Sequence, residues 1–158
     1  MSSASPSSPA ASAGRPPAPL SLKIRNKIME TFHRVGLPVG PVRLLRVRGR
    51  VSGREYTNPV APVTVDGTLY ILQAYPHSDW VKNVRAAGEG TLVRGRTSQR
   101  VRLVEVPPEE RGPIARELPK QVPMGVGVYV KNGVVPDKSP ESFERAAAGI
   151  PVFRVVPV

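Results

Sequence analysis

Cysteine is absent from this chain of 158 residues, and histidine, aromatic residues and long apolar runs are scarce. Without cysteine there is no disulfide framework and no thiolate metal site, as is common in a reducing compartment. The two histidines, His33 and His77, lie in different segments, so a histidine-based zinc site would lack ligands. No stretch approaches the ~18 consecutive apolar residues of a membrane span, and the N-terminus lacks the apolar core of a signal peptide. These absences predict a cytoplasmic protein.

Negative charge is scarce as well. Lys and Arg number 23 against 12 Asp and Glu, which gives a formal net charge of +11. Arginine supplies most of the positive residues, and its planar fork suits phosphates and carboxylates. The excess of positive charge predicts an anionic partner. Three kinds of partner stay open: nucleic acid, an anionic membrane surface and an acidic small molecule.

The first 36 residues divide into two parts. Residues 1–19 are rich in Ser, Pro and Ala and predict a disordered tail, which leaves residues 20–158 as a single domain. Ile24, Ile28, Phe32 and Val35 then form one stripe of a predicted helix. Two interpretations of this helix stay open: it packs on the domain, or it makes a weak contact with the inner membrane surface.

From residue 42 the pattern changes to short, mostly hairpin-linked strands. The expected strands cover residues 42–49, 53–65, 68–75, 91–95, 99–106 and 150–158. The expected helices cover residues 79–87, 107–118 (broken at Gly112–Pro113) and 139–149, whereas residues 123–133 show no clear period. The order predicts an α+β, mainly β fold, in which a small antiparallel β-barrel carries packed helices.

Several common chemistries are excluded by their missing motifs. There is no phosphate-binding G-x-x-x-x-G-K-[ST] loop, no G-x-G-x-x-G fingerprint after a strand and no G-x-S-x-G nucleophile. No pair of carboxylates stands out either. If the protein is an enzyme, a cofactor is expected to supply the chemistry.

An arginine cluster around a glycine turn is the first positive signal. It comprises Arg43, Arg46, Arg48, Arg50 and Arg54. Alternation along a strand places Arg46, Arg48 and Arg50 on one face. Gly49 and Gly53 bracket the turn and allow backbone N–H groups to approach a ligand. A solvated basic edge is the alternative interpretation. Clustering at one turn favours a small acidic ligand over nucleic acid.

The second signal is the helix around the only tryptophan. Ser78 or Asp79 can cap it, and Gly88 can end it. A buried stripe is expected from Trp80, Val81, Val84 and Ala87. Trp80 is then either an ordinary core residue or the wall of a binding site, and Asn83 needs hydrogen-bond partners if it is buried.

These two signals together resemble a known family. RGRVSGREYTNPV, a hairpin and SDWVKNVRAAG, in that order, are similar to the deazaflavin (coenzyme F420)-dependent nitroreductase and quinone reductase family. The resemblance covers about residues 20–106. It implies a split β-barrel of the flavin-reductase type and a coenzyme with a phosphodiester and an oligoglutamate tail. The departures are Val51 in place of a frequent lysine, and a shorter, bulkier QAYPHSDW segment.

By this resemblance, the cofactor-binding residues fall into four groups. Arg50, Ser52 and Gly53 would lie at the phosphate and tail, with Arg54 nearby. Asn58 and Pro59 would line the adjacent strand. Gln73, Ala74 and Tyr75 would flank the deazaflavin ring. Ser78, Trp80 and Asn83 would shape the end of the cleft and its support.

The implied activity is hydride transfer from reduced F420 to a small-molecule acceptor, which is a quinone, a nitro compound or an activated alkene. Tyr75, Tyr129 or water would supply the proton. Two alternatives stay open: an FMN-binding split-barrel oxidoreductase, or a non-enzymatic carrier of an acidic or lipid-like molecule. No metal and no nucleic acid are expected, and a homodimer is left open.

Overall fold

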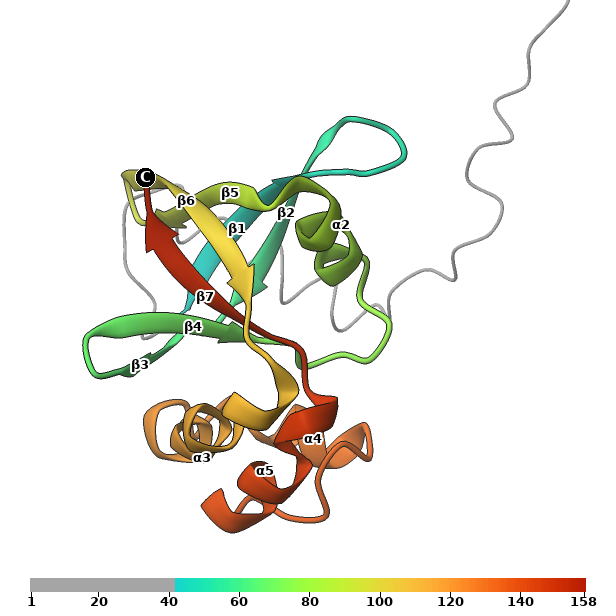
Figure 1. Ribbon diagram of the computed structural model, residues 1–158, viewed down its shortest axis with the longest axis vertical. Coiled ribbons are helices and arrows are strands. Elements are labelled where there is room, and N and C mark those ends of the chain that lie inside the picture. Colours follow the sequence, from blue (N-terminus) through green and yellow to red (C-terminus); the bar gives the residue numbers. More distant parts are fainter. Residues whose placement is uncertain (1–41) are drawn as a thin grey trace, which may run out of the picture.

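The sheet at the centre of the protein has seven strands, all paired antiparallel in the order β2-β1-β5-β6-β7-β4-β3. The computed structural model describes residues 42–158. The predicted tail (1–19) and the predicted first helix, with its membrane-surface alternative, lie outside these residues. The strands are β1 Arg43–Arg48, β2 Glu55–Val60, β3 Val63–Val65, β4 Thr68–Leu72, β5 Glu89–Arg94, β6 Thr97–Glu105 and β7 Val152–Pro157. Figure 1 shows that the sheet curls into a half-barrel, which confirms the predicted fold class.

Alternation along the strands explains how the sheet buries one face. In β1, Leu45 and Val47 are buried whereas Arg46 and Arg48 are exposed. In β6, Val101 and Leu103 are buried and face away from Arg102 and Val104, as predicted. The barrel interior is completed by residues from four further elements: Ile71, Leu92, Phe153, Trp80 and Val84.

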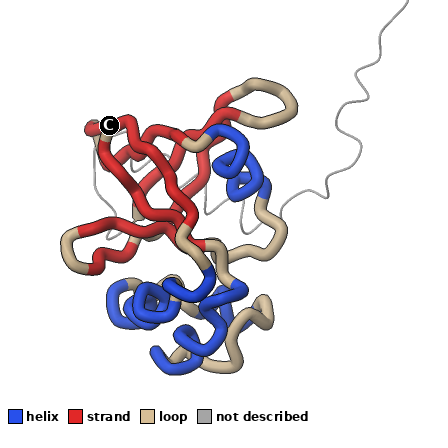
Figure 2. Tube along the Cα trace, viewed as in Figure 1, coloured by secondary structure: helices blue, strands red, loops and turns tan. Residues whose placement is uncertain are grey.

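The helices occupy two separate places. Helix α2 (Asp79–Ala87) packs against β1 and β5. Helices α3 (Gly112–Gln121), α4 (Gly127–Lys131) and α5 (Pro140–Ala146) gather at one end of the sheet, as Figure 2 shows. They enclose a second core around Phe143, Ile114 and Val152. No helix within residues 42–158 has the length and apolar character needed to cross a membrane.

Local signals account for most of the element ends. Gly88 ends α2 in the left-handed conformation (φ 72°), and Ser139 caps α5 by accepting a hydrogen bond from the Ser142 amide. Asp66 and Gly67, with φ of 50° and 77°, form the predicted hairpin turn between β3 and β4. Pro59 lies in β2, which is an edge strand. A strand in this position pairs on one side only, so it tolerates a residue without an N–H group.

The structure differs from the expected elements in five details. Residues 53–65 form two strands, because the chain bends at Ala61–Pro62. The glycine-rich segment contains the short helix α4, and α3 continues past Pro119 to Gln121. Ala87 is exposed and does not belong to the buried stripe of α2. Arg50 lies beyond the end of β1, so it does not share a strand face with Arg46 and Arg48.

Candidate functional site

The turn between β1 and β2 is held by its own short hydrogen bonds. The Gly49 amide donates to the Arg54 carbonyl at 2.6 Å, and the Gly53 amide donates to the Gly49 carbonyl at 3.0 Å. The Ser52 hydroxyl accepts from the Arg54 amide at 3.2 Å and lies 3.0 Å from the Tyr56 hydroxyl. Gly53 has a φ of 74°, a conformation that glycine adopts without steric cost. Ser52 and Gly53 therefore fix the shape of the turn.

Gly49 is required at this turn because of an aromatic neighbour. A Cβ atom added to Gly49 would lie 2.5 Å from the Cε2 atom of Tyr56. The Tyr56 ring can therefore cover the backbone of the turn only where residue 49 has no side chain. Both glycines of the turn have a structural reason to be there.

Arg50 joins this turn to helix α2. Its backbone amide and its guanidinium Nη1 both donate to the Oδ1 atom of Asn83, at 3.1 and 2.8 Å. Its Nη2 atom lies 3.6 Å from Asp79 Oδ1. Asn83 is buried at 5% exposure, so these bonds satisfy an amide oxygen that water cannot reach. We call this arrangement of Arg50, Asn83 and Asp79 the Arg50 latch.

Trp80 supports the latch from inside the barrel. Its exposed fraction is 9%, and its ring lies 5.9 Å from that of Phe153 in a tilted arrangement. Trp80 is therefore a core residue. Because Trp80 and Asn83 share α2, the packing of the first holds the second against the turn.

The loop before α2 departs from ordinary capping. Ser78 occupies the N-cap position, yet its hydroxyl donates to the Tyr75 carbonyl and caps no helical amide. His77 adopts a positive φ of 65°, which is uncommon for a residue with a side chain. The short segment between β4 and α2 is thus tightly turned.

The remaining predicted residues lie on neighbouring strands. Asn58 and Pro59 are half-buried on β2, opposite Leu45 and Leu44 of β1. Gln73 follows β4, and its backbone amide donates a hydrogen bond to the Pro151 carbonyl at 3.0 Å. Ala74 accepts a hydrogen bond from the Asn132 side chain at 3.3 Å, and Tyr75 is half-buried.

Tyr129 lies apart from the turn, in the helical core. It is 4% exposed, and its ring packs edge-on against Phe143 at 5.2 Å. Burial raises the pKa of Tyr129 well above its usual range. Its hydroxyl donates to the Leu72 carbonyl at 3.5 Å. Its predicted role as a proton donor stays a prediction.

The five clustered arginines separate in space. Arg46 and Arg48 point outward from β1, and Arg50 is engaged by the latch. At the far end of β1, burial and the nearby Arg94 lower the pKa of Arg43. The Arg54 guanidinium is exposed and makes no hydrogen bond or ion pair to any other residue within 42–158. Arg54 is therefore the arginine of this turn that is available to an anion.

Two features escaped the sequence analysis. Asp79 was expected at the start of the helix, but its ion pair with Arg50 was not predicted. Arg111 is buried at 6% exposure, and its guanidinium donates to the carbonyls of Val106, Ala148 and Ile150 and to Glu105. Sequence spacing does not predict a buried arginine of this kind, because most of its partners are backbone carbonyls, and any residue type supplies a backbone carbonyl. Within residues 42–158 no group of side chains has the composition of a metal site.

The curled antiparallel sheet, with helices at one end and a cationic glycine turn against a short helix, defines a split-barrel protein of the flavin-reductase-like class. A family model described as F420H(2)-dependent quinone reductase matches residues 24–132, which is more than half of the chain. The chain belongs to this family. It is accordingly an F420-dependent oxidoreductase, with coenzyme F420 as its cofactor.

Solved structures share the fold at low sequence identity. An F420-H2 dependent reductase (FDR-A) is 22% identical, with a TM-score of 0.52 over 73% of this chain and 93% of that one. A protein described as a domain-swapped dimer is 19% identical, with a TM-score of 0.53 over 85% and 98%. The heme storage protein HutZ from Vibrio cholerae is 9% identical, with a TM-score of 0.51 over 84% and 89%. No curated protein matches significantly.

The residues around the turn fit an anionic coenzyme. Within the described part of the chain the Arg54 guanidinium has no acidic partner, whereas the charge of Arg50 is partly balanced by Asp79. The backbone at Gly53 is open, since no atom lies within 4 Å of the position a Cβ would take there, whereas the Tyr56 ring covers Gly49. A phosphate or glutamate carboxylate could therefore approach the turn from the side of Arg54.

Proposed function

We propose that this protein reduces a quinone, with coenzyme F420 held against the surface that the turn of residues 49–54 and the N-terminal part of α2 form together. The supporting observation is the Arg50 latch, because it fixes these two segments to each other through two hydrogen bonds to one buried atom. Reduced F420 supplies a hydride when it is bound. The protein's own contribution is to orient the coenzyme and its acceptor and to exclude water.

In this proposal the anionic part of the coenzyme lies at Arg54, Ser52 and Gly53. Arg50 contributes to the field there but acts mainly by holding the turn in place. Asn58, Pro59, Gln73, Ala74 and Tyr75 line the approach to the ring, and Ser78, Trp80 and Asn83 support it from α2. Nitro compounds and activated alkenes are further acceptors to test, since they also accept hydride at an electron-poor atom.

Titration of the purified protein with F420 and, separately, with FMN tests the cofactor assignment. Arg54→Ala should weaken F420 binding about tenfold, the equivalent of ~1.4 kcal/mol. Arg96→Ala is the matched control, since Arg96 is an exposed arginine in the turn between β5 and β6. Saturable binding of FMN without binding of F420 would favour the flavin alternative. Binding of F420 without turnover of any acceptor would favour the carrier.

Tyr75 is the proton donor in this proposal, because Tyr129 is almost fully buried. Tyr75→Phe should lower kcat for a quinone that needs a proton, while F420 affinity, measured by fluorescence, stays the same. Tyr129→Phe serves as the comparison. A loss of kcat confined to Tyr129→Phe would transfer the role to that residue.

The assembly to test first is a homodimer. A solved structure of similar fold is described as a domain-swapped dimer, and this supports the choice without showing it for this chain. Size-exclusion chromatography with light scattering measures the mass directly. A mass near the 17.0 kDa of one chain at micromolar concentration would exclude the dimer.

A further inference from the structure

A hollow of about 270 Å³ lies on the other side of helix α2. The Arg50 latch uses Asp79 and Asn83, which lie on one flank of the helix because they are four residues apart. The hollow is lined by Val81 and Arg85, also four apart and on the opposite flank. Of the residues assigned above to the coenzyme, only Gln73 and Ser78 line it. It is therefore a different cavity from the turn at Arg54.

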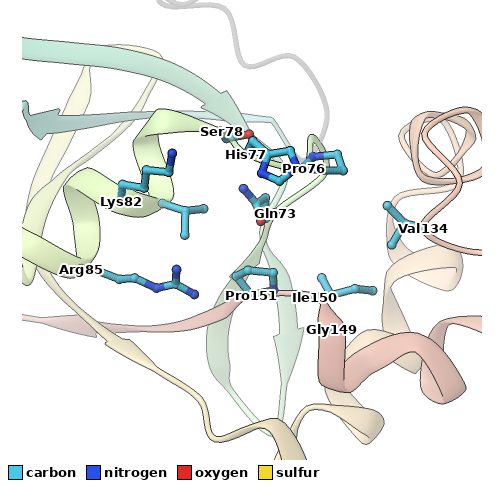
Figure 3. A pocket seen from close by; sticks show the side chains of 11 residues that line it. Gln73, Pro76, His77, Ser78, Lys82, Arg85, Val134, Gly149, Ile150 and Pro151 are labelled. Atoms are coloured by element: carbon cyan, nitrogen blue, oxygen red, sulfur yellow. The ribbon is translucent and has the colours of Figure 1, made fainter.

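The walls of the hollow are largely apolar. Figure 3 shows Pro151 and Ile150 on one side, Val134 facing them from the helical end and Pro76 at the opposite rim. Val81 and Ile150 are almost completely buried, so these walls are backed by the packed core. The volume is close to the lower end of the ~300–1,000 Å³ range of ligand pockets, which suits a molecule with a single ring.

The polar residues of the hollow are Gln73, His77, Ser78, Lys82 and Arg85. In Figure 3 the Gln73 amide lies at the centre, between Lys82 of α2 and His77 of the loop. The Gln73 side chain forms no hydrogen bond with another residue of 42–158, although the residue is half-buried. The positive φ of His77 (65°) is a conformation that often persists at binding sites.

The charge balance of the hollow is positive. Arg85 is compensated, because its Nε and Nη2 atoms donate to the two oxygens of Glu105 at 2.9 and 2.8 Å. Lys82 is exposed and has no ion-pair partner among the residues that the structure describes. An ammonium and a side-chain amide that have no partner within residues 42–158 suit one negative charge.

We propose that this hollow binds a small aromatic monocarboxylate. The ring would lie against the half-buried Val134 and Pro151, and the carboxylate would accept hydrogen bonds from Lys82 and from the Gln73 side-chain amide. A neutral molecule of the same shape would leave Lys82 without a partner, whereas a nucleotide would exceed the volume. The hollow shares Gln73 and Ser78 with the proposed coenzyme site, but its ligand needs no coenzyme, so binding can be measured on the coenzyme-free protein.

Binding of benzoate to the full-length, coenzyme-free protein tests the proposal. In an NMR titration of ¹⁵N-labelled protein, benzoate should shift the Gln73 side-chain amide and the backbone amides of Val81 and Lys82 in a saturable way. Benzyl alcohol, the neutral counterpart, should bind at least about tenfold more weakly. Equal affinity of the two compounds would overturn the assignment of the charge, and shifts only outside the hollow would overturn the site.

Two variants complete the test. Lys82→Gln should weaken benzoate binding about tenfold, whereas Lys120→Gln, on the exposed side of α3, should leave it unchanged. Val134→Phe should abolish binding by filling the hollow, while F420 affinity stays at the wild-type level. The absence of saturable shifts up to about 10 mM benzoate would reject the proposal, whatever the protein does with F420.

Discussion

Asn83 receives both the backbone amide and the guanidinium of Arg50 on a single side-chain oxygen, at 3.1 and 2.8 Å. The two residues are 33 positions apart, and each belongs to a different half of the family signature. The arginine of G-R-x-S-G and the asparagine of W-x-x-N therefore form one structural unit. The order of the two motifs along the chain predicts that they act together, but it does not predict that they touch.

The first prediction concerns this contact. Asn83→Ala should lower the free energy of unfolding by about 1–3 kcal/mol, because the backbone amide and the guanidinium of Arg50 both lose their acceptor. Asn83→Asp should recover much of that loss, since a carboxylate oxygen can accept the same two hydrogen bonds from Arg50. Urea unfolding followed by tryptophan fluorescence measures both changes.

Asn132→Ala is the control for the loss of an amide side chain. Asn132 is exposed, and its side chain makes one hydrogen bond within residues 42–158, to the Ala74 carbonyl at 3.3 Å, so its removal should cost less than ~0.5 kcal/mol. If Asn83→Ala and Asn132→Ala were equally stable, the latch would have no role in stability.

The second prediction concerns the shape of the turn. Gly53→Ala should destabilise the protein by about 1–2 kcal/mol, because the alanine would have to keep the left-handed φ of 74°. A steric clash is not the cause, since no atom lies within 4 Å of the added Cβ atom. Gly149→Ala also meets open space but has no positive φ, so it should be close to neutral. Thermal unfolding compares the two directly, and equal melting temperatures would show that the backbone angle is not the cause.

Much of the fold could be predicted from the sequence because its signals are local. Alternation in β1 and β6, the Asp66–Gly67 turn and the Ser139 cap each depend on neighbouring residues, and each was found where expected. Helix α4 could not be predicted, because glycines interrupt its period and its stability comes from packing Tyr129 against Phe143. The break at Pro62 lies within a run that reads as one strand.

The candidate site could be predicted only in part. Motif spacing pointed to Arg50, Trp80 and Asn83, and the structure brings Arg50 and Asn83 into contact. The sequence assigned Arg50 to the phosphate, however, whereas the structure engages it with Asn83 and Asp79. Which residues Arg50 contacts depends on how two distant segments pack together, and no local sequence pattern predicts that packing. Lys82 escaped notice for the same reason.

The third prediction concerns Arg111, the buried guanidinium behind β6. Arg111→Ala should destabilise the protein by about 3–5 kcal/mol, because the carbonyls of Ala148 and Ile150 lose a charged donor and Glu105 loses a partner. Arg116→Ala is the matched control: Arg116 is exposed on α3 and pairs with Glu141 and Glu144. It should cost no more than ~1 kcal/mol. Similar midpoints for the two variants in urea would contradict the role of Arg111.

The last prediction concerns pH and the carboxylate of Glu105. The hydrogen bond from Arg85, together with the charges of Arg85 and Arg111, lowers the pKa of Glu105 below its ordinary value. The folded protein therefore favours the ionised form. The resulting stability is fully present above the ordinary pKa of about 4.3 and is lost as the pH falls through the lowered pKa. Glu105→Gln removes this dependence.

Urea unfolding of the wild type and of Glu105→Gln at a series of pH values measures the effect. The wild type should be the more stable protein by a constant margin above about pH 6, and the margin should shrink as the pH falls below about 4. Glu89→Gln is the control, because Glu89 is 58% exposed and pairs with Arg100 at 3.3 Å on the surface. Its difference from the wild type should stay near zero throughout. A margin for Glu105→Gln that widens toward acidic pH would show that burial of the carboxyl outweighs its ion pairs.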